Sequence, residues 1–257
     1  MIERRSILMT AAMFEPRSLA ATAAALDREL TDAEPAEIVA QAQRTLGRGR
    51  VAVVSSFGSE SAALLKIVAE VDAAIPVLFL DTGWMFEETL AYRDAVVARL
   101  GLTDVRTITP SPAALARDGA RDLWFADPDA CCTLRKTAPL AHALTAFDGW
   151  INGRKRYHGG ERATLPVVEI DGLRLKFNPL ARVTRPEIDA IFTAAELPRH
   201  PLEAQGFASV GCMPCTSRAA PGQQVRAGRW AGRDKTECGI HAVLAPAGAD
   251  VSTGHMR

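Results

Sequence analysis

Apolar residues recur along the chain in short unbroken runs separated by longer stretches with helical spacing. The runs at residues 51–54 and 76–80 are continuously apolar, as expected for strands buried on both faces, and residues 105–108 are expected to form a third strand. Between them, residues 61–71 and 87–100 have helical character. This alternation predicts right-handed βαβ units and a parallel sheet.

Two further segments extend the pattern. Residues 33–46 have the spacing of a helix, with Asp32 as a candidate cap at its start and Gly47 at its end. Residues 150–152 are expected to form a fourth strand. The chain is therefore predicted to have an α/β fold, a parallel twisted sheet flanked by helices.

A change of pattern follows the fourth strand. Residues 167–177 contain two alternating runs that meet at Asp171 and Gly172, which predicts a hairpin with a type I′ turn. Thr184 and Glu187 have the spacing of a capping box, so a helix is expected to begin there. Beyond it Gly, Pro and Arg become frequent, which predicts a loop-rich C-terminal tail.

Charge is balanced over the whole chain but not along it. The 257 residues include 30 Lys plus Arg and 30 Asp plus Glu, so no global field favours a nucleic acid or a membrane surface as partner. Basic residues gather at 154–156 and 226–235, which predicts a local anionic ligand. The apolar run at residues 7–14 is too short to span a membrane, and we expect a soluble, cytoplasmic protein.

The five cysteines form a pattern that does not suit a secreted disulfide framework. Cys212 and Cys215 have C-x-x-C spacing, which alone fits zinc, a redox dithiol or a cluster equally well. Cys131 and Cys132 are adjacent and cannot easily reach one tetrahedral zinc, whereas a cluster offers separate irons. We therefore predict a [4Fe–4S] cluster on these four cysteines, which leaves Cys238 free.

Lys136 lies four residues after Cys132, on what is expected to be the same helix face. Its ammonium would offset the charge of the thiolates and join the cluster to a substrate. The alternative is a solvated lysine beside Arg135.

Cys238 is a candidate nucleophile because polar and mobile sequence surrounds it. Lys235 and His241 are nearby groups that favour the thiolate, whereas Glu237 opposes it. Gly239 supplies backbone freedom. As an isolated cysteine it would more often be inert.

Small and hydroxyl residues follow the first two strands, at the sheet edge where ligands bind in α/β folds. Backbone N–H groups and a helix N-terminus in the first turn favour a phosphate, although an ordinary tight turn or a helix cap would explain the same residues. Together the turns resemble the ATP-pyrophosphatase (adenine nucleotide alpha hydrolase-like) fold, in which S-x-G-x-[DE]-S follows the first strand. The candidate substrate-binding residues here are Ser56, Gly58, Ser59, Ser61, Asp81 and Thr82.

Five landmarks, in order, resemble the assimilatory adenylyl-sulfate and phosphoadenylyl-sulfate reductase family. They are residues 56–61, residues 80–90, residues 131–136, residues 211–216 and the Glu-Cys-Gly-Ile-His stretch at residues 237–241. The stretch at 237–241 is highly specific. The paired cysteines resemble the cluster-containing branch, which is mostly specific for adenylyl sulfate (APS).

The resemblance implies a two-step reaction in which the Cys238 thiolate attacks the sulfur of APS and expels AMP. Thioredoxin or glutaredoxin would then release sulfite from the sulfonated cysteine. It also implies a catalytic role for His241 and substrate contacts for Lys136, Arg226 and Arg229.

The basic stretch after the fourth strand departs from the family pattern. The family commonly has two arginines there, and the aligned first one is Lys155 in this chain. Bidentate binding of sulfate or phosphate would then come from Arg154 or Arg156.

Three domain-level segments follow. Residues 1–30 are expected to be a disordered leader, and residues 31–200 an α/β nucleotide-binding domain with half of the cluster site. Residues 201–257 hold the C-x-x-C motif and a mobile catalytic tail.

We also expect a homo-oligomer. The alternatives are a phosphoadenylyl-sulfate (PAPS) or dual-specificity reductase, an ATP pyrophosphatase that thiolates tRNA, and a structural metal-binding module.

Overall fold

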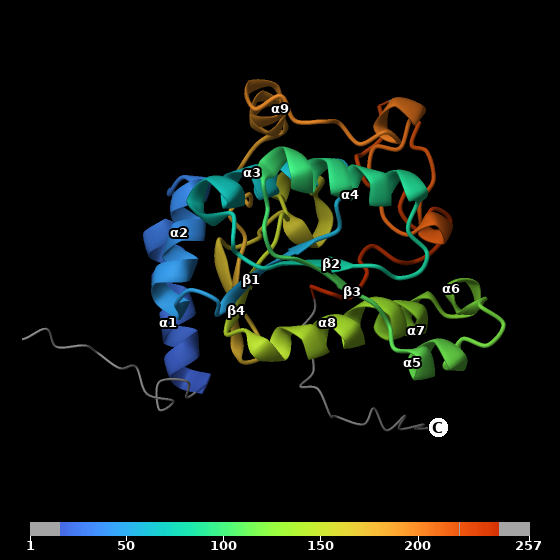
Figure 1. Cartoon of the computed structure of the whole chain (residues 1–257), viewed down its shortest axis with the longest axis horizontal. Helices are drawn as coiled ribbons and strands as arrows, with labels where there is room; N and C mark the ends of the chain where they lie inside the picture. The colour runs from blue at the N-terminus through green and yellow to red at the C-terminus, as the bar shows by residue number, and fades with distance from the viewer. Residues whose placement is uncertain (1–15, 221, 242–257) are drawn as a thin grey trace, which may run out of the picture.

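The computed structural model describes residues 16–220 and 222–241. A six-stranded sheet with the strand order β3-β2-β1-β4-β6-β5 forms its centre (Figure 1). All neighbouring strands are parallel except β5 and β6. The strands are β1 (Val51–Ser55), β2 (Val77–Leu80), β3 (Val105–Ile108), β4 (Gly149–Ile151), β5 (Val168–Asp171) and β6 (Arg174–Phe177).

Helices cover both faces of the sheet (Figure 1). The longer ones are α1 (Pro16–Leu30), α2 (Pro35–Leu46), α3 (Ser61–Asp72), α4 (Glu87–Leu100) and α9 (Arg185–Ala194). The short α-helices are α5 (Pro112–Arg117), α6 (Leu123–Ala126), α7 (Pro128–Cys132) and α8 (Ala138–Ala143), and η2 (Thr133–Thr137) is a π-helical turn. Single 3₁₀ turns are η3 (Leu144–Ala146), η4 (Arg156–His158), η5 (Gly160–Arg162), η6 (Glu203–Gln205) and η7 (Met213–Cys215).

Alternate residues of the central strands pack into two separate apolar cores. Val53 and Phe79 belong to the larger core, which includes residues of α1, α2, α3, α4 and α9. Val54 and Leu78 belong to the smaller core on the opposite face, with Leu140 of α8. Because both faces are covered, β1 up to Val54 and the whole of β2 are apolar, as the sequence pattern predicts. The predicted fold class is confirmed.

The start of α2 differs from the prediction. The helix begins at Pro35, with Glu34 in an extended conformation before it, because proline fits the first helical position and keeps its predecessor out of the helix. Asp32 does not cap α2; it forms an ion pair with Arg182. Gly47 ends the helix as expected.

The hairpin is present, but its turn is not type I′. Asp171 pairs with Arg174, which leaves Gly172 and Leu173 as the two loop residues. Only Gly172 has a positive φ, at 61°, whereas a type I′ turn requires a positive φ at both. At α9, the backbone N–H of Thr184 donates to a Glu187 carboxylate oxygen over 2.7 Å, as in the predicted capping box.

The disordered leader expected over residues 1–30 is contradicted in its second half. Residues 16–30 form α1, and Leu19 and Leu26 lie in the larger core because they share one helix face. Residues 1–15 lie outside the described part of the chain.

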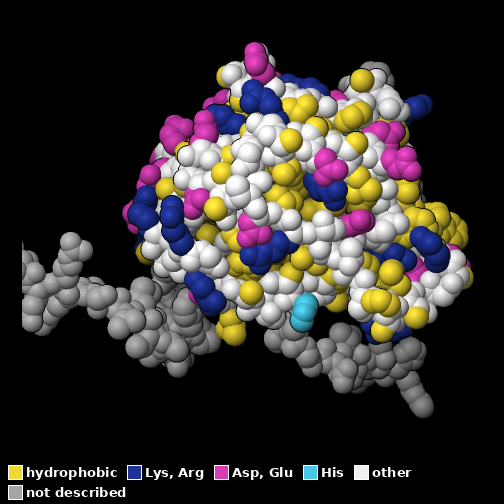
Figure 2. Space-filling model, viewed as in Figure 1, with side chains coloured by type: hydrophobic (Ala, Val, Ile, Leu, Met, Phe, Trp, Pro, Cys, Tyr) yellow, Lys and Arg dark blue, Asp and Glu magenta, His cyan; other side chains and the backbone are white. Residues whose placement is uncertain are grey.

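Side chains of opposite charge are interspersed over the face of the molecule shown in Figure 2, in keeping with the balanced composition. Across the described residues, no helix has both the length and the apolar character needed to cross a membrane.

Candidate active site

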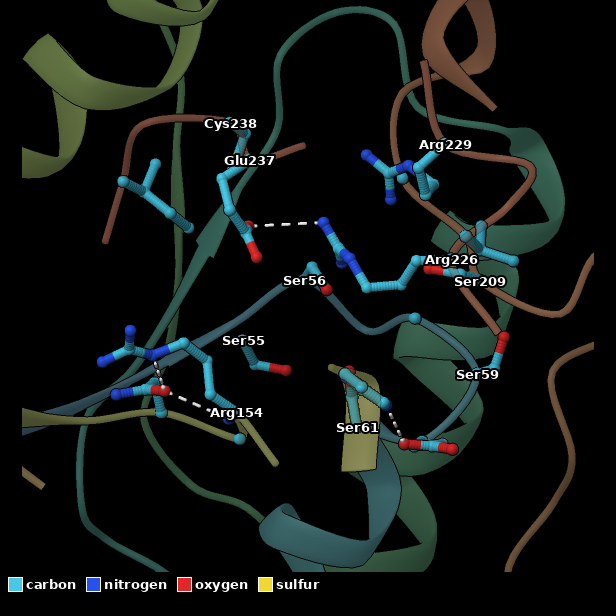
Figure 3. A pocket seen from close by; sticks show the side chains of 18 of the residues that line it. Ser55, Ser56, Ser59, Ser61, Arg154, Ser209, Arg226, Arg229, Glu237 and Cys238 are labelled. Carbon is cyan, nitrogen blue, oxygen red and sulfur yellow. Dashed lines mark hydrogen bonds and ion pairs between the residues drawn. The ribbon is translucent and has the colours of Figure 1, made fainter. Parts of the chain in front are cut away.

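A pocket lies at the carboxyl ends of β1 and β4, the position where open α/β sheets bind ligands (Figure 3). Its walls come from the loop after β1, the loop after β4, residues 208–211 and the C-terminal segment. Ten predicted site residues line it: Ser56, Gly58, Ser59, Ser61, Lys136, Arg154, Arg226, Arg229, Cys238 and His241.

The serine loop after β1, residues 56–61, does not cap α3 through the side chain that precedes the helix. The residue before the helix is Glu60, and its side chain makes no capping bond. The Ser59 hydroxyl is buried in the pocket wall without a hydrogen-bond partner among the described residues. Gly58 packs so closely on Val210 that a Cβ there would lie 3.0 Å from its carbonyl oxygen. A bound polar group would therefore find a free hydroxyl beside the start of a helix.

Three predicted residues lie outside this pocket. Asp81 accepts a bond from the N–H of Gly83 over 2.9 Å and so stabilises its own turn. The Thr82 hydroxyl lies 3.2 Å from the Cys212 sulfur, which places it at the cysteines. Arg156 donates to a backbone carbonyl of the following loop.

Glu60 and Lys155 form a buried ionic centre that the sequence analysis did not identify. Lys155 is 3% exposed, and its Nζ lies 2.9 Å from the Glu60 carboxylate. His158 Nε2 lies 3.1 Å from the same oxygen. Burial raises the pKa of Glu60, but the His158 bond and Lys155 outweigh it and hold that pKa well below the usual range. Glu60 occupies the acidic position of the S-x-G-x-[DE]-S pattern, and this position could have indicated the pair from the sequence.

Glu237 connects the segment that carries Cys238 to two arginines. Arg162 of η5, which the sequence analysis missed, donates to both carboxylate oxygens, over 2.6 and 2.9 Å. Arg226 donates to the same carboxylate over 3.3 Å (Figure 3). Burial raises the pKa of Glu237, whereas the Arg162 bond and charge lower it further than burial raises it. The ion pairs hold residue 237 at the pocket.

The other side of Cys238 is held by apolar and backbone contacts. Gly239 has a φ of 81°, which a residue with a side chain rarely adopts. Ile240 packs on the smaller core. The His241 ring stacks on Trp150, with centroids 5.9 Å apart and planes at 7°. Burial, followed by nearby cations, lowers the pKa of His241 far below its usual value, so its ring is neutral.

The four other cysteines line a second cavity together. Cys131 and Cys132 come from α7, and Cys212 and Cys215 from the turn at η7. All of them are free thiols. The Asp127 side chain caps α7 by accepting two backbone N–H bonds, which fixes the first pair.

Among residues 16–220 and 222–241, no three His, Cys, Asp or Glu side chains are arranged to hold one metal ion. Four thiols nevertheless surround one cavity that also contains aromatic, proline and cationic side chains. Thiols spread around a shared space fit a polynuclear iron–sulfur group, in which each sulfur ligates its own iron.

Lys136 lies in the walls of both cavities, as does Trp230. Burial lowers the pKa of Lys136, but negative charge on the sulfur atoms of Cys212 and Cys238 raises it more, so the side chain stays an ammonium. Its neighbour Arg135 is 3% exposed and pairs with Asp118 over 2.5 Å. The Lys136 side chain thus lies between the two cavities, which argues against the alternative of a solvated lysine beside Arg135.

Comparisons with known proteins find relatives over most of the chain. A family model described as the phosphoadenosine phosphosulfate reductase domain matches residues 50–218. The adenosine 5′-phosphosulfate reductase of Mesorhizobium japonicum is 49% identical over 224 residues, 87% of this chain and 88% of the relative. The phosphoadenosine 5′-phosphosulfate reductase of Gloeobacter violaceus is 38% identical over 223 residues, which are 84% of this chain and 92% of that relative. The solved phosphoadenylyl-sulfate reductase of Candida auris, a phosphate complex, shares the fold, with a TM-score of 0.64 and 22% identity over 74% of this chain and 94% of that chain.

Proposed function

The chain belongs to the phosphoadenosine phosphosulfate reductase family, and from this premise we propose that it reduces APS to sulfite and AMP in sulfate assimilation. One observation carries the proposal: Cys238, the cysteine outside the four-thiol cavity, lines the pocket that the serine loop and the arginines also form. A nucleophilic thiol thus shares a pocket with groups suited to a nucleotide and its anions.

In the proposed first step the Cys238 thiolate attacks the sulfur of APS. A bond forms between the two sulfur atoms while the bond from that sulfur to the bridging oxygen breaks, and AMP leaves with the electron pair. In the second step a thiolate of thioredoxin or glutaredoxin attacks the sulfur of Cys238 and expels sulfite. The second thiol of that reductant then attacks the mixed disulfide and frees Cys238. Oxidation of the two thiols to a disulfide supplies the two electrons that reduce the sulfate group to sulfite.

The cations in the pocket have a clear task in this scheme. Sulfate and phosphate repel a thiolate, so positive groups have to neutralise them before attack. Lys136, Arg226 and Arg229 line the pocket and are assigned to these anions, with Arg154 on the opposite wall. The serine loop is assigned to the nucleotide phosphate. His241, held neutral by burial, would contribute a hydrogen bond rather than a charge.

We assign the four-thiol cavity to a [4Fe–4S] cluster. When bound, such a cluster adds a fixed charged centre next to Lys136, which also lines the substrate pocket. Anaerobic purification followed by visible absorption and iron and sulfide analysis tests this assignment. Four irons and four sulfides per chain would support it, and a colourless protein with one zinc would contradict it.

The nucleophile is tested with Cys238→Ser. After incubation with APS and no reductant, the wild-type protein should gain the mass of one sulfo group, located on the peptide that contains residue 238. The variant should gain none, and its sulfite formation should fall to background, because a hydroxyl at neutral pH is a far weaker nucleophile than a thiolate. Arg156→Lys, outside the pocket, serves as the control and should retain activity.

A variant that still forms sulfite at the wild-type rate would contradict the role of Cys238. Side-by-side turnover of APS and PAPS separates the two substrates, since a relative named for each nucleotide matches most of this chain. Equal or faster turnover of PAPS would contradict the preference for APS. The expected homo-oligomer stays a prediction, to be measured by light scattering.

A further inference from the structure

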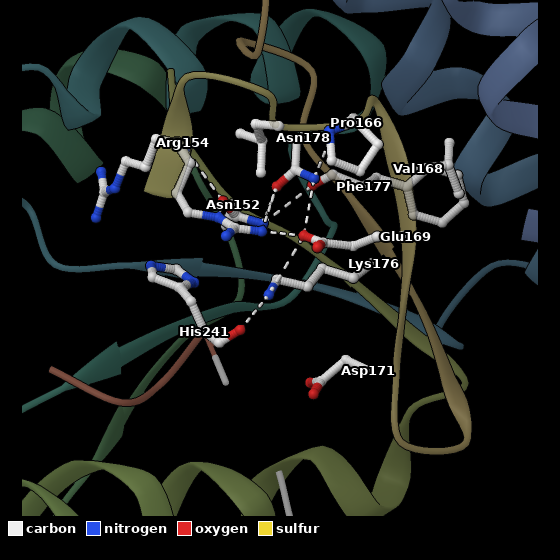
Figure 4. A network of polar contacts seen from close by, with 12 residues as sticks. Asn152, Arg154, Pro166, Val168, Glu169, Asp171, Lys176, Phe177, Asn178 and His241 are labelled. Atoms are coloured by element: carbon white, nitrogen blue, oxygen red, sulfur yellow. Dashed lines mark hydrogen bonds and ion pairs between the residues drawn. The ribbon is translucent and has the colours of Figure 1, made fainter. Parts of the chain in front are cut away.

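Lys176, in the middle of β6, is a buried cation that the proposed reaction does not use. It is 1% exposed and does not line the substrate pocket. A buried ammonium is costly unless other groups compensate its charge and satisfy its donors. Its Nζ lies 3.4 Å from a Glu169 oxygen, which also accepts bonds from Arg154 and Asn178 (Figure 4). Glu169 therefore does not serve Lys176 alone.

The short hydrogen bond of Lys176 goes instead to the C-terminal segment. Its Nζ donates to the backbone carbonyl of His241 over 3.1 Å, across 65 residues of sequence (Figure 4). The same ammonium lies 4.8 Å from the ring centroid of Trp150, on which the His241 ring stacks. Trp150 is fully buried and is itself held by a bond from its indole N–H to Asp171 over 2.9 Å. Two neighbouring strands thus form a rigid receptor for residue 241.

This receptor differs in kind from the contact on the other side of Cys238. Glu237 is bound by Arg162 and Arg226, which an anionic substrate would attract away from it. A backbone carbonyl and a stacked neutral ring present no such competition. The contacts of His241 can therefore persist while substrate occupies the arginines, three residues beyond the nucleophile.

We propose that Lys176 is a positioning residue for Cys238: it fixes the backbone of His241 and so sets where the thiol lies over the pocket, without touching substrate. The proposal rests on the proposed function, in which Cys238 attacks the bound nucleotide. Misplacing a reacting group by about 1 Å can lower the rate by about a hundredfold, so a contact of this kind acts on kcat rather than on substrate binding.

Lys176→Met tests the proposal, because it keeps most of the unbranched side chain and removes the donor and the charge. We expect kcat to fall by about tenfold to a hundredfold with KM nearly unchanged. In the absence of substrate, alkylation of Cys238 by iodoacetamide, located by mass spectrometry in cluster-containing protein, should become faster. Lys176→Gln can still donate to the carbonyl. It should therefore restore part of the kcat and slow part of the increased alkylation.

Lys66→Met is the matched control, since Lys66 pairs with Glu70 on the surface of α3. Iron content and the urea midpoint of every variant establish that it is folded. Wild-type kcat and alkylation rate in a folded Lys176→Met protein would overturn the proposal, as would a raised KM at unchanged kcat. If the wild-type protein fails to turn over APS, the proposed function fails, and the alkylation comparison still tests the contact.

Discussion

Glu60 lies in the serine loop, 9% exposed, where cations of the loop after β4 and of α9 reach its carboxylate. Lys155 and His158 contact one oxygen and Arg185 lies 3.3 Å from the other. Lys155 is more deeply buried than Glu60, so removing the charge of Glu60 would leave the ammonium of Lys155 buried without this partner of opposite charge. A single carboxylate therefore fixes the loop after β4 against the loop after β1, and with them two walls of the pocket.

Glu60→Gln should lower the free energy of unfolding by about 3 kcal/mol, because it leaves the charge of Lys155 buried and poorly compensated. Urea denaturation at neutral pH measures the change. Glu37→Gln is the control: that carboxylate pairs with Arg44 at the surface, with 53% of its side chain exposed, and its loss should change little. Equal stability of wild type and Glu60→Gln would show that the buried pair contributes nothing net.

At the scale of elements, β4 connects the two halves of the sheet. It pairs with β1 on one side and with β6 on the other. Its first residue, Gly149, has no room for a side chain: a Cβ would lie 2.7 Å from the carbonyl oxygen of Leu175 in β6 and would overlap Leu46 of α2. The glycine thus allows α2 and β6 to approach the same strand, which places Lys176 beside Trp150.

Gly149→Ala should therefore destabilise the protein by about 1–3 kcal/mol, since the neighbouring backbone has to move to relieve the contact. The urea midpoint measures this loss. Gly153→Ala provides a matched comparison just after the same strand, where the added Cβ would come no closer than 3.6 Å to Leu64. A midpoint for Gly149→Ala equal to that of Gly153→Ala would contradict the steric argument.

For the whole molecule, carboxylates paired with cations contribute to how stability responds to acid. The pKa values of Glu60 and Glu237 are both held below the ordinary value of 4.5. Their stabilising contribution is complete above 4.5, the pKa in the unfolded chain, and is lost as pH falls through the lower folded values. Both carboxylates hold the pocket walls, so acid should weaken the fold and the site together.

We expect the free energy of unfolding to fall as pH decreases below 4.5, and to fall less steeply in the Glu60→Gln/Glu237→Gln double variant. Urea titrations at a series of pH values, on protein stripped of iron so that acid lability of a cluster does not contribute, give both slopes. Parallel curves for the two proteins would show that these carboxylates do not titrate differently on folding.

Much of the fold could be predicted because it follows from local spacing. The apolar runs of β1 and β2 and the helical spacing of α4, with Gly101 in a left-handed cap, are visible in the sequence. The start of α2 was mispredicted because Pro35 overrides the cap offered by Asp32. Helix α1 was missed because its segment lies near the terminus and was assigned to a leader, although Leu19 and Leu26 share its buried face.

The site was predictable where its residues stand in compact motifs and not where distant residues pair. The serine loop and the cysteines were candidates from their spacing, and the family resemblance singled out Cys238; the structure places the serine loop and Cys238 in one pocket. Arg162 and Glu237 are 75 residues apart, and nothing in the spacing of charges shows that they meet. In the sequence, Lys176 is one polar position of an alternating strand. Only its contact with His241 in the structure distinguishes it from the other polar positions.

The position of β1 in the sheet has a consequence for how the chain folds as it is made. Val53 pairs with Val77, but the other edge of β1 waits for Gly149, the partner of Val51, which is synthesised 149 − 51 = 98 residues later. At about 5–20 residues per second, that edge stays open for roughly 5–20 s. An open apolar strand edge is a template for pairing between chains. Nascent chains of this protein therefore pass through an interval in which a chaperone at the ribosome would protect the half-built sheet from aggregation.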